Sequence, residues 1–491
     1  MLQNNLQAIV LAAGKSTRFN TDKTKLIEKI CGQEMILFTT KLLEKMKLDT
    51  TIIVGHQKEI VKTVISANHQ SSINFIHQKE LLGTGHAVAC TKDLWNKQDI
   101  LILNGDMPIV TKEIIDNVYK AHKESDAAIS FVISHHPGNH AYGRVIEDKS
   151  GIKIVEAKDF KHKIGEDHCW INAGIYIAKK DFLQDCIHNI EKSSVTNEFY
   201  ITSLIQMAND QNLKVTTSKA PFDRIRGVNT FEELWAAEQI KRADLIKYWM
   251  RQGVRFHVAQ NIHIDIDVQI GAGTQIGCGV HLLSGTKVGK NCAIRNFSTV
   301  ENATIEDNVI VMPNCIIRDS HVCKNAQIGP FAHIHSESKI EEEAAVGNFV
   351  EVKKSIVGKQ TFAKHLAYLG NATIGSKVNI GAGTITCNHN GIEKNETIIK
   401  NNAYIGSNNT LVAPVTIEQN AFTAAGSTIT EDVPKNCLSI ARAKQVNKED
   451  YVQKLFEKLK KRSDDASKKE SKQQESFTCG IKKEKNKLKE L

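Results

Sequence analysis

A period of six residues runs through the second half of the 491-residue chain and constrains its fold more than any other feature. Aliphatic residues recur at every sixth position from 264 to 300, and after shifts of register the spacing resumes as far as 429. The first unbroken series consists of Ile264, Ile270, Ile276, Leu282, Val288, Ile294 and Val300. This period predicts a β-helix, in which each flat face is a short strand whose aliphatic side chain points inward.

The first half of the chain follows another pattern. Short β-branched runs at 7–11, 51–54, 100–103 and 128–133 alternate with stretches of helical spacing, such as 112–122. This alternation predicts a doubly wound, Rossmann-like α/β sheet. We therefore expect four parts: an α/β domain over 1–230, a linker helix over 231–252, a left-handed β-helix over 253–450 and a tail over 451–491.

Most of the formal net charge of +9 comes from the tail. From 454 to 491 there are 13 Lys or Arg and seven Asp or Glu, with too few apolar residues to bury a core. We expect a disordered, basic tail that is either simply solvated or a tether for nucleic acid or an acidic surface. The remaining chain is nearly neutral, which argues against a dedicated nucleic-acid binder.

Several observations point to a cytoplasmic enzyme that does not act in a membrane. No apolar run approaches the roughly 20 residues that span a bilayer. No secretory signal pattern is visible at the amino terminus. The 11 cysteines form no CxxC pair, so we expect reduced thiols.

The loop after the first strand-like run, in AIVLAAGKSTRFNTDKTKL (residues 8–26), has two interpretations. Its Gly-Lys-Ser-Thr resembles the end of a P-loop, but that motif requires a glycine at position 9, which is Ile9. We therefore predict a strand-end loop whose backbone N–H groups approach an anion, helped by Lys15, Arg18 and Lys25.

This stretch is similar to the sugar nucleotidyltransferase signature LAAGxGTRMxSxxPKxL. The later segments QKELLGTGHA, LNGDMP, YGRV, VEAKD, NAGIY and GVNT, between residues 78 and 230, follow in that family's order. With the β-helix, residues 6–450 resemble the family of bifunctional N-acetylglucosamine-1-phosphate uridylyltransferase / glucosamine-1-phosphate N-acetyltransferase. The resemblance implies a homotrimer that uses acetyl-CoA, UTP, glucosamine-1-phosphate and N-acetylglucosamine-1-phosphate as small-molecule substrates.

For uridylyl transfer, the resemblance implies that Arg18 and Lys25 hold phosphates and that Asp106 and Asn229 hold Mg²⁺. A carboxylate at the end of a buried strand, as at Asp106, is by itself a suitable hard ligand for that ion. For Glu156 the alternative is an ordinary solvated charge at the end of a strand, with no role in binding. The residues implied for the nucleotide and UDP-sugar are Leu11, Ala12, Ala13, Gly14, Lys25, Gln78, Gly83, Thr84, Asn104, Gly105, Asp106, Gly143, Glu156, Asn172 and Asn229.

For acetyl transfer, the resemblance implies His365 in FAKHLAYLG as the general base, and an imidazole suits proton abstraction near neutral pH. Glu351 is expected to orient or polarise the local network. The residues implied for the sugar phosphate are His335, Lys353, Tyr368 and Asn379. Those implied for acetyl-CoA are Ala382, Asn388, His389, Ser407, Ala425 and Arg442.

Four positions depart from the family's pattern. Ser16 stands where glycine is usual and Thr24 where proline is usual, so we expect altered constants rather than inactivity. His335 stands where arginine is usual and His389 where tyrosine is usual, so we expect weaker sugar-phosphate binding. Two alternatives stay open: a nucleotidyltransferase whose β-helix is only an oligomerisation scaffold, and a protein that binds nucleotide-sugar without turnover.

Overall fold

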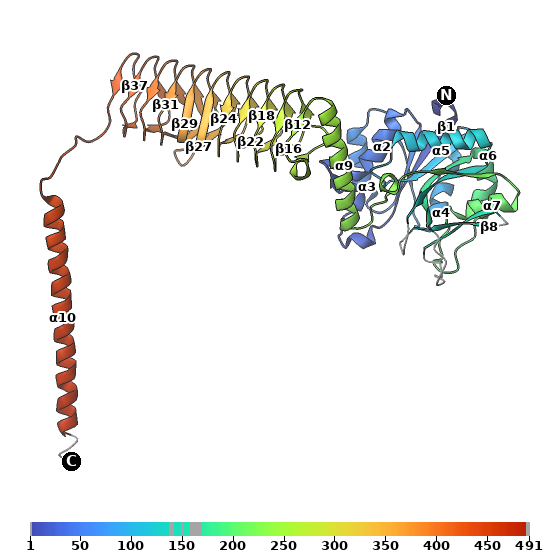
Figure 1. Cartoon of the computed structure of the whole chain (residues 1–491), viewed down its shortest axis with the longest axis horizontal. Coiled ribbons are helices and arrows are strands. Elements are labelled where there is room, and N and C mark those ends of the chain that lie inside the picture. The colour runs from blue at the N-terminus through green and yellow to red at the C-terminus, as the bar shows by residue number, and fades with distance from the viewer. Residues whose placement is uncertain (1, 137–141, 149–150, 158–168, 488–491) are drawn as a thin grey trace. The chain divides into compact units, whose positions relative to one another are not determined.

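Strand β1 (Leu6–Ala12) lies in the middle of a nine-stranded sheet in the computed structural model, which describes residues 2–136, 142–148, 151–157 and 169–487 (Figure 1). Lys158 and Asp159 of the VEAKD motif lie outside the described residues. The strand order is β11 (Val215–Lys219), β7 (Ile129–His135), β10 (Trp170–Lys179), β6 (Asp99–Asn104), β1, β4 (Thr50–Val54) and β5 (Asn74–His77), with β8 (Arg144–Asp148) and β9 (Gly151–Val155) paired beside β10.

The parallel strands β1 and β6 place their following loops at one edge of the sheet. Leu11 pairs with Asn104 in register, so Gly14 and Asp106 follow strands that end side by side. Strand β10 is antiparallel to both β6 and β7, which makes the sheet mixed. Ligand sites of open α/β sheets lie at such a carboxyl edge.

Helices cover both faces of this sheet. On one face, Val10 packs in a core with residues of α2 (Met35–Lys45), α3 (Lys58–Asn68) and α5 (Lys112–Ser125). On the other, Ile9 packs with residues of α4 (Thr84–Ala89), α6 (Lys180–Cys186) and α7 (Ser203–Asp210). The alternation of β1 side chains between two cores confirms the predicted doubly wound architecture. Helix α9 (Phe231–Arg251) follows.

The six-residue period gives a β-helix from β12 (Arg255–Phe256) to β39 (Leu438–Ser439) (Figure 1). Ile276 pairs with Ile294, 18 residues later, so three hexads make one coil. Ile294 pairs with Val311 after 17 residues, so a shift of the sequence register corresponds to a coil shortened by one residue. The predicted β-helix is confirmed.

Most strands of the β-helix are two or three residues long, because its corners interrupt them every six residues. The exceptions are β27 (Ala345–Lys353) and β29 (Phe362–Gly370), which run through a corner as nine-residue strands. Between β32 (Ile385–Cys387) and β33 (Thr397–Ile399) a loop lengthens the coil. Six of the candidate acetyltransferase residues lie on these two strands or in this loop: Glu351, Lys353, His365, Tyr368, Asn388 and His389.

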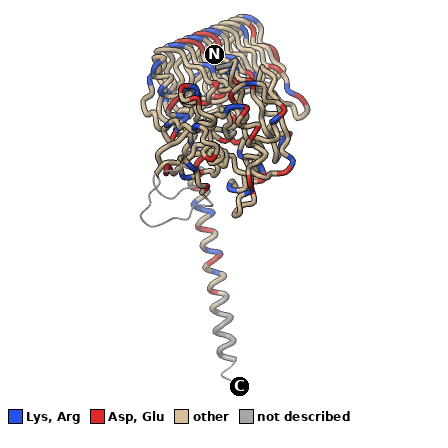
Figure 2. Tube along the Cα trace, turned by 90° about the vertical axis from the view of Figure 1, so that its right-hand side faces the viewer, with Lys and Arg blue, Asp and Glu red and all other residues tan. Residues whose placement is uncertain are grey.

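Contact density divides the chain into Met1–Ser439 and Ile440–Leu491. The second unit contains helix α10 (Tyr451–Lys487), whose described side chains are all exposed. The sequence predicted a disordered tail, whereas the structure shows a helix. Interactions between side chains one helical turn apart explain the helix. Acidic residues precede lysines by four positions at Glu457/Lys461 and Asp464/Lys468, which stabilises an isolated helix. Figure 2 shows basic and acidic residues interspersed along the described part of this helix. Among the described residues, no helix is long and apolar enough to cross a bilayer.

Candidate functional site

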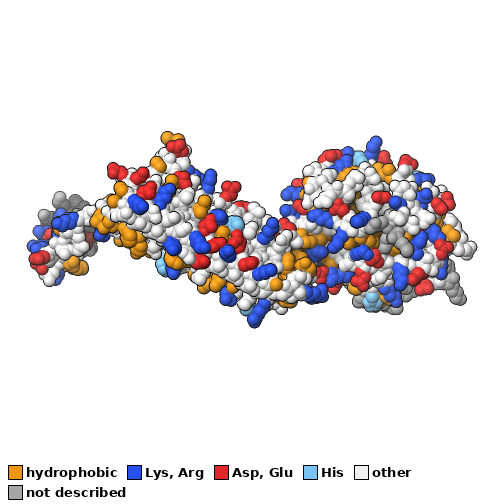
Figure 3. All heavy atoms as spheres, turned by 90° about the horizontal axis from the view of Figure 1, so that it is seen from above, with side chains coloured by type: hydrophobic (Ala, Val, Ile, Leu, Met, Phe, Trp, Pro, Cys, Tyr) orange, Lys and Arg blue, Asp and Glu red, His pale blue; other side chains and the backbone are white. Residues whose placement is uncertain are grey.

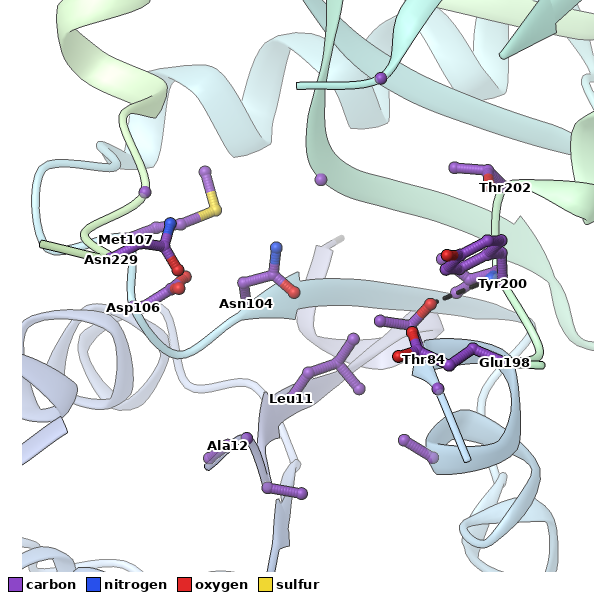
Figure 4. Close-up of a pocket in the computed structure, with 18 of the residues that line it drawn as sticks. Leu11, Ala12, Thr84, Asn104, Asp106, Met107, Glu198, Tyr200, Thr202 and Asn229 are labelled. Carbon is purple, nitrogen blue, oxygen red and sulfur yellow. Dashed lines mark hydrogen bonds between the residues drawn. The ribbon is translucent and has the colours of Figure 1, made fainter. Parts of the chain in front are cut away.

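A cavity of about 650 Å³ opens at the carboxyl edge of the α/β sheet. Its floor comes from the ends of β1 and β6, represented in Figure 4 by Leu11 and Asn104. Asp106 and Asn229 lie on one side of these residues, and Thr84, Glu198 and Tyr200 lie on the other (Figure 4).

Lys25 joins the two oxygen donors at one end of this cavity. Its Nζ lies 2.5 Å from Asp106 Oδ2 and 2.7 Å from Asn229 Oδ1. Arg18 donates to the same Asn229 oxygen at 2.8 Å. A carboxylate and an amide oxygen therefore converge on one positively charged nitrogen, which is the arrangement that a hard cation also requires.

Helix α9 fixes the position of Asn229 through a capping box. Thr230 precedes the helix and its Oγ1 accepts from the Glu233 N–H at 3.1 Å, while Glu233 Oε2 accepts from the Asn229 N–H at 2.6 Å. The Val228 N–H donates to Asp106 O at 2.9 Å and ties the two ligand-bearing loops together. Both candidate metal ligands are thus held by backbone bonds.

Ser16 and Thr24, the two departures from the nucleotidyltransferase signature, have specific contacts. Ser16 adopts φ 57°, and its Oγ accepts from the Lys25 N–H at 3.0 Å. Thr24 is fully buried with φ −67°, and its N–H donates to Gln57 Oε1 at 2.8 Å. Gln57 Nε2 donates in turn to Asp22 O. The side chains of Ser16 and Gln57 therefore fix the backbone that leads to Lys25. The family usually has glycine at position 16 and proline at position 24.

Gly83 lets two distant segments meet beside the nucleotide residues. At its φ of +103°, a Cβ atom would lie 2.6 Å from the Phe199 carbonyl oxygen, so only glycine fits. The neighbouring Gln78 is buried and donates to Gly83 O at 3.1 Å. Thr84 Oγ1 accepts from the Ile201 N–H at 3.0 Å and draws residues 198–202 to the cavity.

The opposite wall contains polar groups suited to a sugar. Asn172 donates its N–H to Gly143 O at 2.9 Å, and its Nδ2 donates to Tyr176 Oη at 2.5 Å. Thr202 Oγ1 donates to Glu156 Oε1 at 2.7 Å, so Glu156 is part of the wall rather than a solvated charge at a strand end. Burial, and then the charge of Glu156, raise the pKa of Tyr176 and keep it a neutral hydroxyl.

The cavity brings together nearly all of the residues expected to hold the nucleotide and sugar. Gly105 lies behind the lining, where its N–H donates to Leu11 O at 2.9 Å. Sequence reasoning missed several polar or aromatic lining residues: Tyr142, Tyr176, Glu198, Tyr200, Thr202 and Glu233. The segment 198–202 carries no motif that would have shown its role, because long-range bonds at Leu82, Thr84 and Gly85 bring it there.

In the β-helix, four expected residues occupy equivalent positions on successive coils. Ala363 pairs with Ile380, Ile380 with Ile405, and Ile405 with Thr423. The residues two positions further along form a column across the same corner: His365, Ala382, Ser407 and Ala425. The His365 side chain is exposed and lies at one end of this column.

A second row lies on a neighbouring flat face. His335 pairs with Lys353, and Glu351 pairs with Tyr368. His335 Nε2 lies 3.1 Å from Glu351 Oε1, so the histidine has a carboxylate partner. Expected sugar-phosphate residues are thus adjacent on this face, whereas Asn379 lies on β31 (Asn379–Ile380), in register with Phe362.

The loop between β32 and β33 reaches the same row. Asn388 is buried, and its Nδ2 donates to Asn371 Oδ1 at 2.8 Å; the Asn371 N–H donates to Lys353 O at 3.0 Å. His389 is exposed and accepts from the Gly391 N–H at 3.2 Å. Arg442, expected at acetyl-CoA, lies in the second unit and is exposed.

Comparison with known proteins also divides the chain into an α/β half and a hexapeptide-repeat half. Residues 7–250 match the Nucleotidyl transferase family, and residues 267–302 match the Bacterial transferase hexapeptide (six repeats) family. The chain is 38% identical to the Bifunctional protein GlmU of Thermosipho africanus, with coverage of 91% of this chain and 97% of that protein. It is 37% identical to the Bifunctional protein GlmU of Clostridium botulinum (strain 657 / Type Ba4), with 91% and 98% covered.

These similarities extend through both halves and confirm the resemblance drawn from the sequence motifs. They join a nucleotidyl transferase region to a hexapeptide transferase region in the order that the fold shows. The chain belongs to the family of bifunctional GlmU proteins.

Proposed function

We propose that the chain makes UDP-N-acetylglucosamine in two steps at two sites. The β-helix acetylates glucosamine-1-phosphate from acetyl-CoA, and the α/β domain then transfers a uridylyl group from UTP to the product. The convergence of Lys25, Asp106 and Asn229 at the end of a cavity lined by the expected nucleotide residues carries this proposal.

In uridylyl transfer, a phosphate oxygen of N-acetylglucosamine-1-phosphate attacks the α-phosphorus of UTP. The bond to the β-phosphate oxygen breaks and pyrophosphate leaves. Negative charge grows on phosphoryl oxygens, so the main task of the protein is to position and neutralise them. Lys25 and Arg18 supply positive charge, while Asn172, Glu156 and the backbone at Gly143 orient the sugar.

Asp106 and Asn229 fit Mg²⁺ because their oxygens already converge on the Lys25 ammonium nitrogen. When bound there, the ion would neutralise charge on the phosphates. Lys25 would then be free to contact the phosphates, and the capping box holds Asn229 in place.

Pyrophosphate release from UTP and N-acetylglucosamine-1-phosphate tests this site. Asp106→Asn keeps the shape of the side chain but removes its charge, so we expect a loss of about 100-fold or more in kcat. Glu59→Gln, at an exposed carboxylate of α3, is the matched control and should leave the rate unchanged. Full activity in the Asp106 variant would contradict the proposed ion site.

In acetyl transfer, the amine of glucosamine-1-phosphate attacks the thioester carbon of acetyl-CoA. His365 takes the amine proton, the carbon–sulfur bond breaks, and coenzyme A leaves as a thiol after it accepts a proton. Ala382, Ser407 and Ala425 continue the column from His365 and leave room for an elongated cofactor, since their side chains are small. Lys353 and Tyr368 face the sugar phosphate.

Release of coenzyme A thiol from acetyl-CoA and glucosamine-1-phosphate tests the second site. His365→Ala should reduce kcat by about 100-fold or more, whereas His188→Ala, in the α/β domain, should not change it. His335 and His389 favour a second candidate, a uridylyltransferase on a β-helical scaffold. Pyrophosphate release without thiol release from the unmodified protein would establish that alternative.

We further propose a cytoplasmic homotrimer. Phe297, Phe331, Phe349 and Leu366 occupy one corner of the β-helix at equivalent positions and are 47% to 62% exposed. Figure 3 shows hydrophobic side chains in patches along the repeat on the face in view. A row of exposed apolar side chains of this kind is typical of protein–protein contacts. Light scattering should give three times the chain mass of 54.6 kDa.

A further inference from the structure

His333, which the acetyltransferase assignment does not use, lies in a cluster with His335 and Glu351. Strand β25 (His333–His335) places both histidines on one outward face, because Ile334 between them is fully buried. The two imidazole rings stack with centroids 4.2 Å apart and planes at 18°. Two parallel imidazoles therefore offer ring nitrogens to the same region.

The next coil supplies a carboxylate to this pair. Glu351 of β27 lies opposite His333 in register, and its Oε1 lies 3.1 Å from His335 Nε2. One donor atom from each of the three residues lies within 4.8 Å of the others. Metal bonds of about 2.0–2.1 Å place tetrahedral ligands about 3.4 Å apart, so the two stacked rings must tilt toward a shared ion to close the set.

We propose that His333, His335 and Glu351 bind a divalent transition-metal ion of the zinc class and that its open position takes the phosphate of the sugar phosphate. Two imidazoles and one carboxylate are a ligand set for such ions that leaves coordination positions for a substrate. The phosphate assignment rests on the proposed acetyl transfer, whereas the metal assignment does not.

The charges around the cluster favour an anion at the open position. Lys353 lies opposite His335 on the following coil, and the register places Arg318 opposite His335 on the preceding coil. Glu301 Oε2, 3.1 Å from Arg318 Nε, partly offsets the arginine. A metal-bound phosphate would thus lie between two basic side chains. A metal ion would also supply positive charge at position 335, where the family usually has arginine.

A second group of three potential metal ligands is present, and the tests must distinguish it from the first. Among the described residues, Glu306, His321 and Cys323 also bring donor atoms within 4.8 Å. Cys323 is buried, and burial, together with the charge of Glu306, raises the pKa of its thiol to about 11. Cys323→Ser removes the thiol ligand and serves as the parent for the tests below.

The first test is a titration of the full-length Cys323→Ser protein with Co²⁺, followed by visible absorbance, and with Zn²⁺, followed by calorimetry. With excess Mg²⁺ present to fill the proposed Asp106 site, we expect one equivalent of each ion and d–d bands without thiolate-to-cobalt charge transfer. His333→Ala should abolish this binding, and Glu351→Gln should weaken it at least tenfold. His188→Ala should change nothing. Equal binding by the parent and His333→Ala would overturn the metal site.

The second test compares metal-loaded and chelator-treated parent in the thiol-release assay. Zinc should lower KM for glucosamine-1-phosphate at least threefold, and His333→Ala should remove that difference. An unchanged or raised KM would overturn the phosphate assignment. If the parent released no thiol in either state yet showed the cobalt bands, the proposed acetyl transfer would fail with the phosphate assignment, and the metal assignment would stand.

Discussion

Thr24 donates its backbone N–H to Oε1 of Gln57 at 2.8 Å, and this bond satisfies a fully buried donor immediately before Lys25. Thr24 has φ −67°, the value that a proline ring imposes. The hydrogen bond to Gln57 therefore fixes the backbone at position 24, which the proline usual in the family would fix through its ring.

A double-mutant cycle tests this relationship. Gln57→Leu should destabilise the protein by about 1–2 kcal/mol, because it leaves the Thr24 N–H buried without an acceptor. Thr24→Pro removes that donor, so the same Gln57 change should cost much less in its presence. Urea unfolding of the four proteins measures the coupling, and kcat/KM for UTP should follow the same order. Additive effects of the two substitutions would contradict the arrangement.

A pair of substitutions at Ser16 separates backbone strain from hydrogen bonding. Ser16→Gly loses the bond to the Lys25 N–H but relieves the strain of φ 57°, so the two effects nearly cancel. Ser16→Ala loses the bond and keeps the strain. We expect KM for UTP to rise more in the alanine variant, by about fivefold to tenfold relative to the glycine variant. The reverse order would show that backbone strain at position 16 does not set KM for UTP.

The sequence predicted the architecture because both halves carry strong local periodicity. The hexads correspond to coils of 17 or 18 residues, as the pairing of Ile276 with Ile294 and of Ile294 with Val311 shows. The helical tail was not anticipated, because composition describes the lack of a core and says little about isolated helices.

The sequence also indicated most of the nucleotide cavity, because its residues lie directly after strands or in short motifs. Thr202 and Glu198 escaped notice, since the bonds that hold this segment at the cavity join residues 46 to 117 positions apart. The bond from Gln57 to Thr24 spans 33 residues and has no local signal either. Motifs identify groups that contact substrate, whereas the contacts that position those groups depend on the tertiary fold.

Glu233 positions Asn229, and this predicts a change in the magnesium requirement. Glu233→Ala removes the acceptor of the Asn229 N–H, 2.6 Å away, whereas Glu233→Gln keeps an oxygen that can complete the capping box. We expect the alanine variant to need about ten times more Mg²⁺ for half-maximal pyrophosphate release and the glutamine variant to stay near the unmodified protein. Equal behaviour of the two variants would contradict a positioning role.

Asp99 predicts how stability depends on pH. It is 1% exposed at the start of β6, with Lys123 Nζ at 2.9 Å from Oδ2 and His122 Nε2 at 3.4 Å from Oδ1. Burial alone would raise the pKa of Asp99, but interactions with His122 and Lys123 lower it below its ordinary value. The folded chain therefore binds fewer protons here than the unfolded chain, and the stability gained is present above about pH 4.

Asp99→Asn should accordingly reduce the free energy of unfolding by about 2 kcal/mol at pH 7, and the difference from the unmodified protein should shrink as pH falls below about 4. Urea unfolding between pH 3 and 7 measures this. Asp126→Asn is the matched control, since Asp126 pairs with Lys179 but is exposed, and water screens that pair. A difference at Asp99 that stays constant across this range would show that the loss reflects side-chain packing, because only the ionised carboxylate gains from the two basic neighbours.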